Sequence, residues 1–123
     1  LDSDALKFEC GSPNFLGIHA LGAAIDLVLE IGPLEVERQV LATTDALREA
    51  LGIRGYRVLG PDGADERSGI TTIRTERPPE MVVARLRDAR VLASARGGGV
   101  RLSPHFYCNA DDVARCLDVL AEK

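Results

Sequence analysis

The apolar run LGIHALGAAIDLVLEIG, from Leu16 to Gly32, is the feature that most constrains the fold of this chain. Its only strongly polar side chains are His19, Asp26 and Glu30, so a helix drawn through the run is apolar on every side. A surface helix of a small domain has one apolar stripe and one charged face, whereas a helix that is apolar all round is buried. The run is therefore either the central helix of a compact fold or a helix that packs against a second domain or subunit. We favour the second interpretation.

Two further features favour a partner for this helix. Small residues three or four positions apart would let another element approach it closely, namely Gly17, Ala20, Ala23 and Ala24. The chain also begins with Leu1 rather than Met, so we expect a segment to precede it.

Bulk composition narrows the class of protein. A length of 123 residues suits one compact domain, residues 1–123, and 46% hydrophobic with 28% charged residues excludes the disordered and collagen-like classes. The net charge of -4 gives no electrostatic signature of a nucleic-acid partner. The apolar stretch from Phe15 to Leu29 is shorter than a membrane span of about 20 residues, so we expect no membrane partner.

The cysteines Cys10, Cys108 and Cys116 are odd in number and lack a CxxC spacing. This pattern argues against a disulfide framework and against a zinc site, so we expect no metal site. Buried or inert thiols in a reducing compartment fit the pattern better, and we expect a cytoplasmic protein.

Two helices are predicted in the first half of the chain. The first runs from about Pro13 to Glu30, with Ser12 as its N-cap, Pro13 at the first helical position and Gly32 after its end. The second begins at Pro33 and is closed by Gly52. It has an apolar stripe at helical spacing, formed by Leu34, Val36, Val40, Leu41, Leu47 and Leu51.

The pattern then changes to short strands and two more helices. Strands are predicted at 55–60, 68–75, 91–95 and 100–106, and a third helix at 78–90. A fourth helix begins at Asn109, with Asp112 at its third position in a near capping box. The order α-α-β-β-α-β-β-α predicts an α+β fold: a small, mostly antiparallel sheet covered by helices on one face. Residues 1–32 would form an interface segment and residues 33–123 the α+β body.

Two places combine polar side chains with glycine. Gly11 lets the backbone approach a ligand, and Ser12 offers a hydroxyl beside a helix start, which suits an anion such as phosphate. A serine here can equally be only a helix cap. After the glycines of RGGG, alternation places Arg101, Ser103 and His105 on one face of a strand that Pro104 perturbs. An arginine there is either a solvated or salt-bridged surface residue or a rigid fork for a carboxylate.

Two motifs resemble the class V aminotransferase family of fold-type-I pyridoxal-phosphate enzymes, which includes cysteine desulfurases and relatives of kynureninase. KFECGSPNFLGIHALGAAIDLVLEIG is similar to the family segment RFExGTPN…GxxALGAAL. GGGVRLSPHFYCNADDVARCLDVL is similar to its C-terminal GGxxRxSxxxYNTxEEIDxLxxxL. The resemblance covers nearly all of residues 7–120 and implies the small C-terminal domain of such an enzyme.

The resemblance implies roles for particular residues. Ser12, with Gly11 beside it, would contact the phosphate of pyridoxal phosphate across a homodimer, and Arg101 would bind the α-carboxylate of an amino-acid substrate. His105 is a further candidate for substrate binding. The Schiff-base lysine belongs to the family's large domain, and the lysines of this chain are only Lys7 and Lys123. We therefore expect no catalytic residue in the chain, no cofactor bound to it alone and no activity without that missing domain.

The resemblance is incomplete in one informative place. Cysteine desulfurases carry a nucleophilic cysteine before the substrate-binding arginine, and residues 89–100 contain none. The parent enzyme is thus expected to catalyse transamination, epimerisation or a lyase reaction. The alternative is a stand-alone α+β module that binds or senses a small anion.

Overall fold

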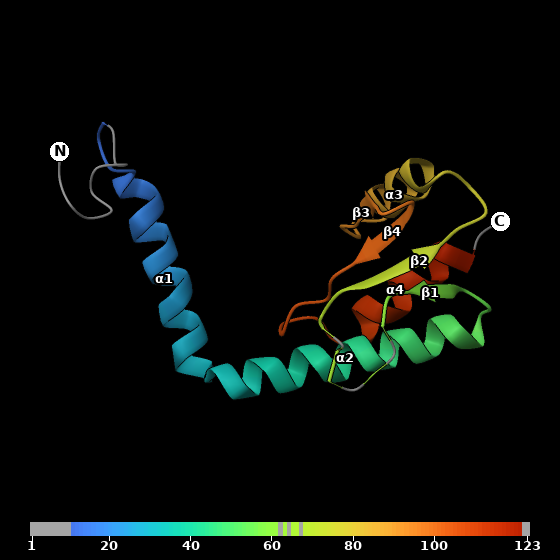
Figure 1. The fold of residues 1–123 in the computed structure, drawn as a ribbon, viewed down its shortest axis with the longest axis horizontal. Helices are drawn as coiled ribbons and strands as arrows, with labels where there is room; N and C mark the ends of the chain where they lie inside the picture. The colour runs from blue at the N-terminus through green and yellow to red at the C-terminus, as the bar shows by residue number, and fades with distance from the viewer. Residues whose placement is uncertain (1–10, 62, 64, 67, 122–123) are drawn as a thin grey trace. The chain divides into compact units, whose positions relative to one another are not determined.

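The computed structural model describes residues 11–61, 63, 65–66 and 68–121 (Figure 1). The chain divides into two compact units, residues 1–33 and residues 34–123. The predicted element order and the α+β class are both confirmed. The elements are α1 (Phe15–Ile31), α2 (Pro33–Ile53), β1 (Arg57–Leu59), β2 (Thr71–Arg74), α3 (Pro79–Asp88), β3 (Ser94–Arg96), β4 (Gly99–Leu102) and α4 (Ala110–Ala121).

The start of α1 differs from the prediction. Asn14 is the N-cap, because its Oδ1 accepts a hydrogen bond of 3.0 Å from the backbone N–H of Gly17. Asparagine caps helices as well as serine does, so the chain had two candidates two residues apart. The prediction that Ser12 caps the helix and that Pro13 opens it is therefore wrong. The end is as predicted: Gly32, with φ 95°, follows the helix.

The helix α1 buries none of its own residues. Phe15, Leu16 and Leu21 are 64%, 83% and 62% exposed. An exposed apolar surface of this extent is unusual on a monomeric soluble protein and is typical of an interaction site. Among the described residues, no single helix is long and apolar enough to cross a membrane, and α1 and α2 meet the length and composition test only as a bent pair.

The four strands form one antiparallel sheet in the order β1-β2-β4-β3. Neighbouring β3 and β4 are joined by Gly97 and Gly98, whose φ angles are 58° and 72°. A two-residue hairpin with both φ angles positive is the turn type that matches strand twist, and glycine adopts it without strain. The central pair β2–β4 joins segments that are distant in sequence and separated by α3.

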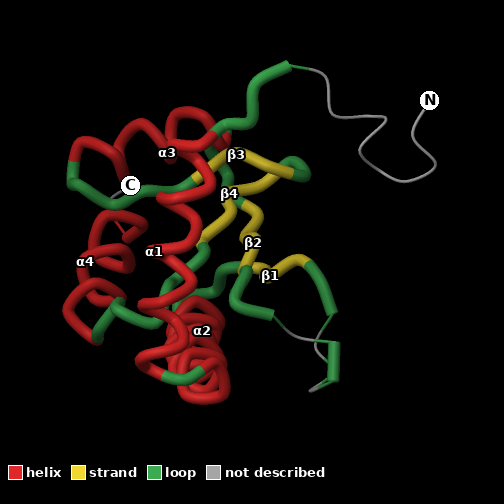
Figure 2. Tube along the Cα trace, turned by 90° about the vertical axis from the view of Figure 1, so that its left-hand side faces the viewer, coloured by secondary structure: helices red, strands yellow, loops and turns green. Residues whose placement is uncertain are grey.

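Strand alternation gives the sheet one covered face. Thr71 and Ile73 of β2 lie opposite Leu102 and Val100 of β4, and all four are buried. Figure 2 shows α3 and α4 on one side of the strands. The core between sheet and helices contains Leu47, Leu51, Ile73, Val82, Val83, Leu86, Val100, Leu102, Cys116, Leu117 and Leu120.

Only the second half of α2 joins this core. Thr44, Leu47 and Leu51 are its buried residues, whereas Leu34 at the start of the predicted stripe is 82% exposed. The helix also continues through Gly52 to Ile53, beyond the predicted end.

The start of α4 confirms the predicted capping box. The side chain of Asn109 accepts from the N–H groups of Asp111 (2.8 Å) and Asp112 (3.1 Å). In return, Asp112 Oδ2 accepts from the N–H of Asn109 at 3.0 Å. The reciprocal bonds satisfy helix-end donors that would otherwise lack partners, so a shorter acid can replace the usual Glu or Gln.

We predict that Asn109→Ala lowers the free energy of unfolding by about 1 kcal/mol, because the N–H groups of Asp111 and Asp112 lose the side-chain oxygen to which they donate. Ser12→Ala should leave that free energy unchanged, since Ser12 is exposed and is not the cap of α1. Urea unfolding followed by circular dichroism measures both variants. Equal losses for the two would contradict the assignment of the caps.

A second prediction concerns two buried threonines. Thr71 Oγ1 is buried and has no hydrogen-bond partner within residues 11–61, 63, 65–66 and 68–121, whereas Thr44 Oγ1 donates to the carbonyl of Val40 at 2.7 Å. Thr71→Val should therefore raise the free energy of unfolding by about 1 kcal/mol, and Thr44→Val should not raise it. The same unfolding measurement compares them. A destabilised Thr71→Val variant would show that the hydroxyl has a partner.

Candidate functional site

Arg101 lies at the centre of the sheet, on the face away from the core. Its strand β4 runs between β2 and β3, and the register places Arg101 opposite Thr72 on one side and Ser94 on the other. Because the adjacent Val100 and Leu102 point into the core, alternation directs Arg101 to the opposite side. We call this side the open face and define it by Arg57, Leu59, Thr72, Arg74, Ser94, Arg96, Gly99 and Arg101.

The surroundings of Arg101 leave its guanidinium ready for an anion. The side chain is half-buried, and its Nε is buried with no hydrogen-bond partner among the described residues. A buried N–H donor without an acceptor costs free energy, which an incoming anion would recover. The planar guanidinium presents several donors in a fixed fork, which matches the two oxygens of a carboxylate. The site is thus suited to carboxylate binding.

His105 lies elsewhere. Because β4 ends at Leu102, the predicted alternation that would place Ser103 and His105 on one face with Arg101 does not extend that far. The N–H of Cys108 donates to the carbonyl of His105 at 3.0 Å, which closes a turn. The N–H of His105 contacts Cys108 Sγ at 3.4 Å. His105 is exposed, so its role in substrate binding stays a prediction.

The turn exposes a small aromatic cluster. The ring of His105 stacks on Tyr107 with centroids 4.6 Å apart and planes inclined by 20°. It also contacts Phe106 at 4.6 Å with an inclination of 58°. Ring contacts of this kind favour one orientation of the imidazole.

A cavity of about 380 Å³ lies beside this turn, and His105, Leu47 and Leu102 are among the described residues that line it. Arg101 is not among them. Cys108 and Cys116 also line the cavity, and both are free thiols. Burial raises the pKa of the Cys116 thiol to about 11, so it carries almost no thiolate at neutral pH. Cys10 lies outside the described residues, which contain no group of His, Cys, Asp or Glu able to hold a metal ion.

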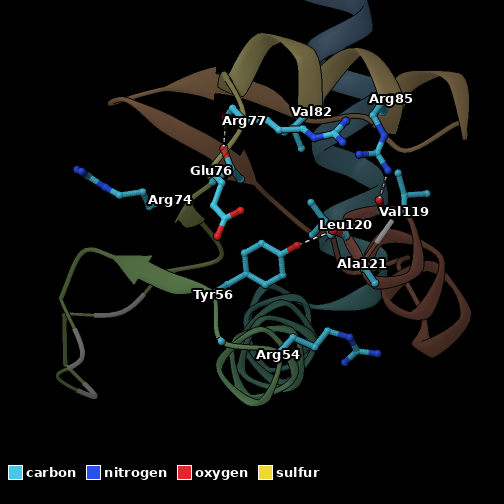
Figure 3. Close-up of a pocket in the computed structure, with 12 residues that line it drawn as sticks. Arg54, Tyr56, Arg74, Glu76, Arg77, Val82, Arg85, Val119, Leu120 and Ala121 are labelled. Atoms are coloured by element: carbon cyan, nitrogen blue, oxygen red, sulfur yellow. Dashed lines mark hydrogen bonds between the residues drawn. The ribbon is translucent and has the colours of Figure 1, made fainter. Parts of the chain in front are cut away.

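A second cavity, of about 400 Å³, lies beside side chains that donate hydrogen bonds to the end of α4 (Figure 3). The hydroxyl of Tyr56 donates to the carbonyl of Leu120 at 2.5 Å, and Arg85 Nη2 donates to the carbonyl of Val119 at 2.9 Å. These carbonyls belong to the last turn of α4, where no helical N–H can reach them. Of the arginines that line this cavity, Arg74 points away from Tyr56 and α4 in Figure 3.

Gly11 and Ser12 belong to the first unit. Gly11 has φ 94°, a conformation that side chains disfavour. Ser12 is exposed and makes no hydrogen bond to other described residues, so its hydroxyl is available to a ligand. The helix start is a weaker anion site than predicted, because Asn14 already accepts from Gly17.

Sequence reasoning missed the neighbours of Arg101. Thr72, Arg74, Ser94 and Arg96 join it on the open face through the register. Alternation within each strand could have identified which of these residues share a face. The strand order that brings them together is a long-range property that no local pattern records.

The fold defines the class of protein. Comparison with solved structures finds the apo structure of cysteine desulfurase from Thermococcus onnurineus NA1, with a TM-score of 0.87 and 25% identity. That similarity covers 99% of this chain and 34% of the other. The family model described as aminotransferase class-V matches residues 1–115. The chain therefore belongs to the class V aminotransferase family, whose members depend on pyridoxal phosphate.

Two relatives illustrate the range of the family. An uncharacterized aminotransferase, YcbU of Bacillus subtilis (strain 168), is 29% identical over 120 residues, which are 97% of this chain and 32% of that protein. A cysteine desulfurase of Yersinia pseudotuberculosis serotype O:1b (strain IP 31758) is 40% identical over 65 residues, 52% of this chain and 15% of that protein. The chain spans about a third of the length of the Bacillus relative and of the Thermococcus structure.

Proposed function

We propose that this chain is the C-terminal domain of a pyridoxal-phosphate enzyme that acts on an amino acid, and that Arg101 binds the α-carboxylate of the substrate. The observation that carries the proposal is the buried Nε of Arg101 at the centre of the open face, for which the described part of the chain offers no hydrogen-bond partner. Membership of the class V aminotransferase family supplies the reaction class. The fork orients the amino acid by two charge-assisted hydrogen bonds and fixes the direction of its α-carbon.

The residues of the chain fit a supporting role toward the cofactor. When bound, pyridoxal phosphate supplies an electron sink for the bonds at the substrate α-carbon. Ser12, with its free hydroxyl next to Gly11, offers one donor to the phosphate from the interface segment, residues 1–32. One donor does not hold a cofactor, and both lysines of the sequence, Lys7 and Lys123, lie outside the described residues. The large domain would supply the Schiff-base lysine, so the chain by itself is inactive.

The exposed apolar residues of α1 support a partner of this kind. The helix carries seven large apolar side chains that are about half exposed or more: Phe15, Leu16, Ile18, Leu21, Ile25, Leu27 and Leu29. These side chains would be buried against the large domain or the second subunit of a homodimer. Relatives about three times the length of this chain are consistent with a large domain outside it.

The reaction is transamination, epimerisation or a lyase reaction. Residues 89–100 contain no cysteine, so the chain lacks the nucleophile that desulfuration would need in this loop. Cysteine desulfurase is thus the name of relatives rather than the proposed activity of the parent enzyme.

We predict that Arg101→Gln in the full-length gene product lowers kcat/KM for its amino-acid substrate by about 100-fold, because charge-assisted bonds to a carboxylate contribute about 1.5–3 kcal/mol. Cofactor absorbance should be unchanged, since Arg101 would contact the substrate. Arg115→Gln, an exposed arginine on α4, is the matched control and should leave kcat/KM within about twofold. An unchanged KM for Arg101→Gln would refute the role of Arg101.

The alternative function is a stand-alone module that binds a small anion through the same arginine. The two functions differ in the behaviour of the 123-residue chain by itself. A separated enzyme domain should self-associate through α1, whereas a module should be monodisperse. Analytical ultracentrifugation measures the difference, and Leu16→Ser with Leu21→Ser should convert a self-associating chain into a monomer. A monomeric wild-type chain would favour the module.

A further inference from the structure

The open face carries four arginine side chains. The register places Arg57 opposite Arg74 and Arg96 opposite Gly99, in the row next to Arg101. Arg57, Arg74 and Arg96 are exposed, and Arg101 is half-buried. Like charges directly opposite each other on a sheet are destabilising unless something of opposite charge lies between them.

No acidic side chain of the sheet balances this charge. The strands contain no Asp or Glu, and no ion pair joins these four arginines to any other described residue. Glu76, which follows β2, turns toward Tyr56 in Figure 3, whereas Arg74 points away from both. The chain as a whole has a net charge of -4, so the basic face is a local concentration within an acidic protein. A group of complementary charge would therefore have to come from outside the sheet.

Three of the arginines lie around Gly99, which is buried. Gly99 lies on β4 two residues before Arg101, and Arg74 and Arg96 flank it on the neighbouring strands. A Cβ at Gly99 would lie 2.4 Å from the carbonyl oxygen of Ile73, so no side chain can fill the position. Diagonal neighbours across antiparallel strands are about 7–8 Å apart, within reach of long side chains. Because no side chain separates them at Gly99, the three guanidinium groups can approach one small ligand on the open face.

We propose that the substrate is a dicarboxylic amino acid, with its α-carboxylate on Arg101 and its side-chain carboxylate on Arg74 and Arg96. The inference rests on the proposed function of Arg101 and extends it to the class of substrate. Two carboxylates separated by a short carbon chain match cations at diagonal positions, whereas a single carboxylate would leave the second pair unused. Thr72 and Ser94, which flank Arg101 directly, add hydroxyl groups that can donate to the same ligand.

Binding of two simple acids to the full-length gene product tests the inference without any need for turnover. Glutarate carries two carboxylates, and butyrate carries one on a chain of similar length. Isothermal titration should give glutarate an affinity about tenfold higher than that of butyrate. Arg74→Gln and Arg96→Gln should each weaken glutarate by about fivefold and leave butyrate unchanged, whereas Arg101→Gln should weaken both. Arg87→Gln, an exposed arginine of α3, is the control and should alter neither affinity.

Equal affinities for glutarate and butyrate would overturn the inference. So would Arg74→Gln and Arg96→Gln variants that bind glutarate as tightly as the wild type does. A third such result is that these variants lose domain or subunit assembly while their preference for glutarate over butyrate is unchanged. The last result would assign the face to an acidic protein surface. Melting temperatures near that of the wild type would show that the variants are folded.

The role of Arg101 and the class of substrate can fail separately. If Arg101→Gln raises KM while Arg74→Gln and Arg96→Gln keep their preference, only the substrate class is wrong. If Arg101→Gln has no effect but glutarate binding depends on the other two, only the role of Arg101 is wrong.

Discussion

The pairing of β2 with β4 is the constraint on which the rest of the structure depends. It places Ile73 beside Val100 and Thr71 beside Leu102 on the covered face, so that the helices of the second unit have a surface to pack on. The same hydrogen bonds place Thr72 beside Arg101 on the other face. A shift of this register by one residue would put Arg101 into the core and Val100 into solvent. Packing of the core and presentation of the arginine are therefore two results of one alignment.

Local signals in the sequence were sufficient for most of the fold. The helix-breaking glycines, the change from helical spacing to short β-branched segments and the capping sequence at Asn109 each act within a few residues, so the element order could be predicted. The start of α1 could not, because Ser12 and Asn14 are both good caps and only the hydrogen bond to Gly17 distinguishes them. How much of the apolar stripe of α2 lies in the core also depends on the position of the sheet. The spacing of apolar residues within the helix does not reveal that position.

The candidate site likewise contains residues that a local pattern identifies and residues that it does not. Arg101 could be identified from its motif and from alternation within one strand, whereas its neighbours Arg74 and Arg96 come from strands whose order is set by the whole fold. The predicted strand at 100–106 placed His105 on one face with Arg101, although Pro104 was expected to perturb it. Proline lacks the N–H that a strand ladder uses, and β4 ends two residues earlier. The end of β4 before Pro104 therefore removes His105 from the strand face on which alternation had placed it with Arg101.

The two-sided sheet has a consequence for how such an enzyme can diversify. Residues that alternate along β2, β3 and β4 meet different requirements: every second one packs toward the helices, and those between them lie on the open face, where we propose that the substrate binds. Exchanging Arg74 or Arg96 for another residue would alter recognition while the hydrocarbon interior stayed untouched. Relatives could therefore acquire new substrate preferences through substitutions on one surface of four short strands, without a loss of folding stability.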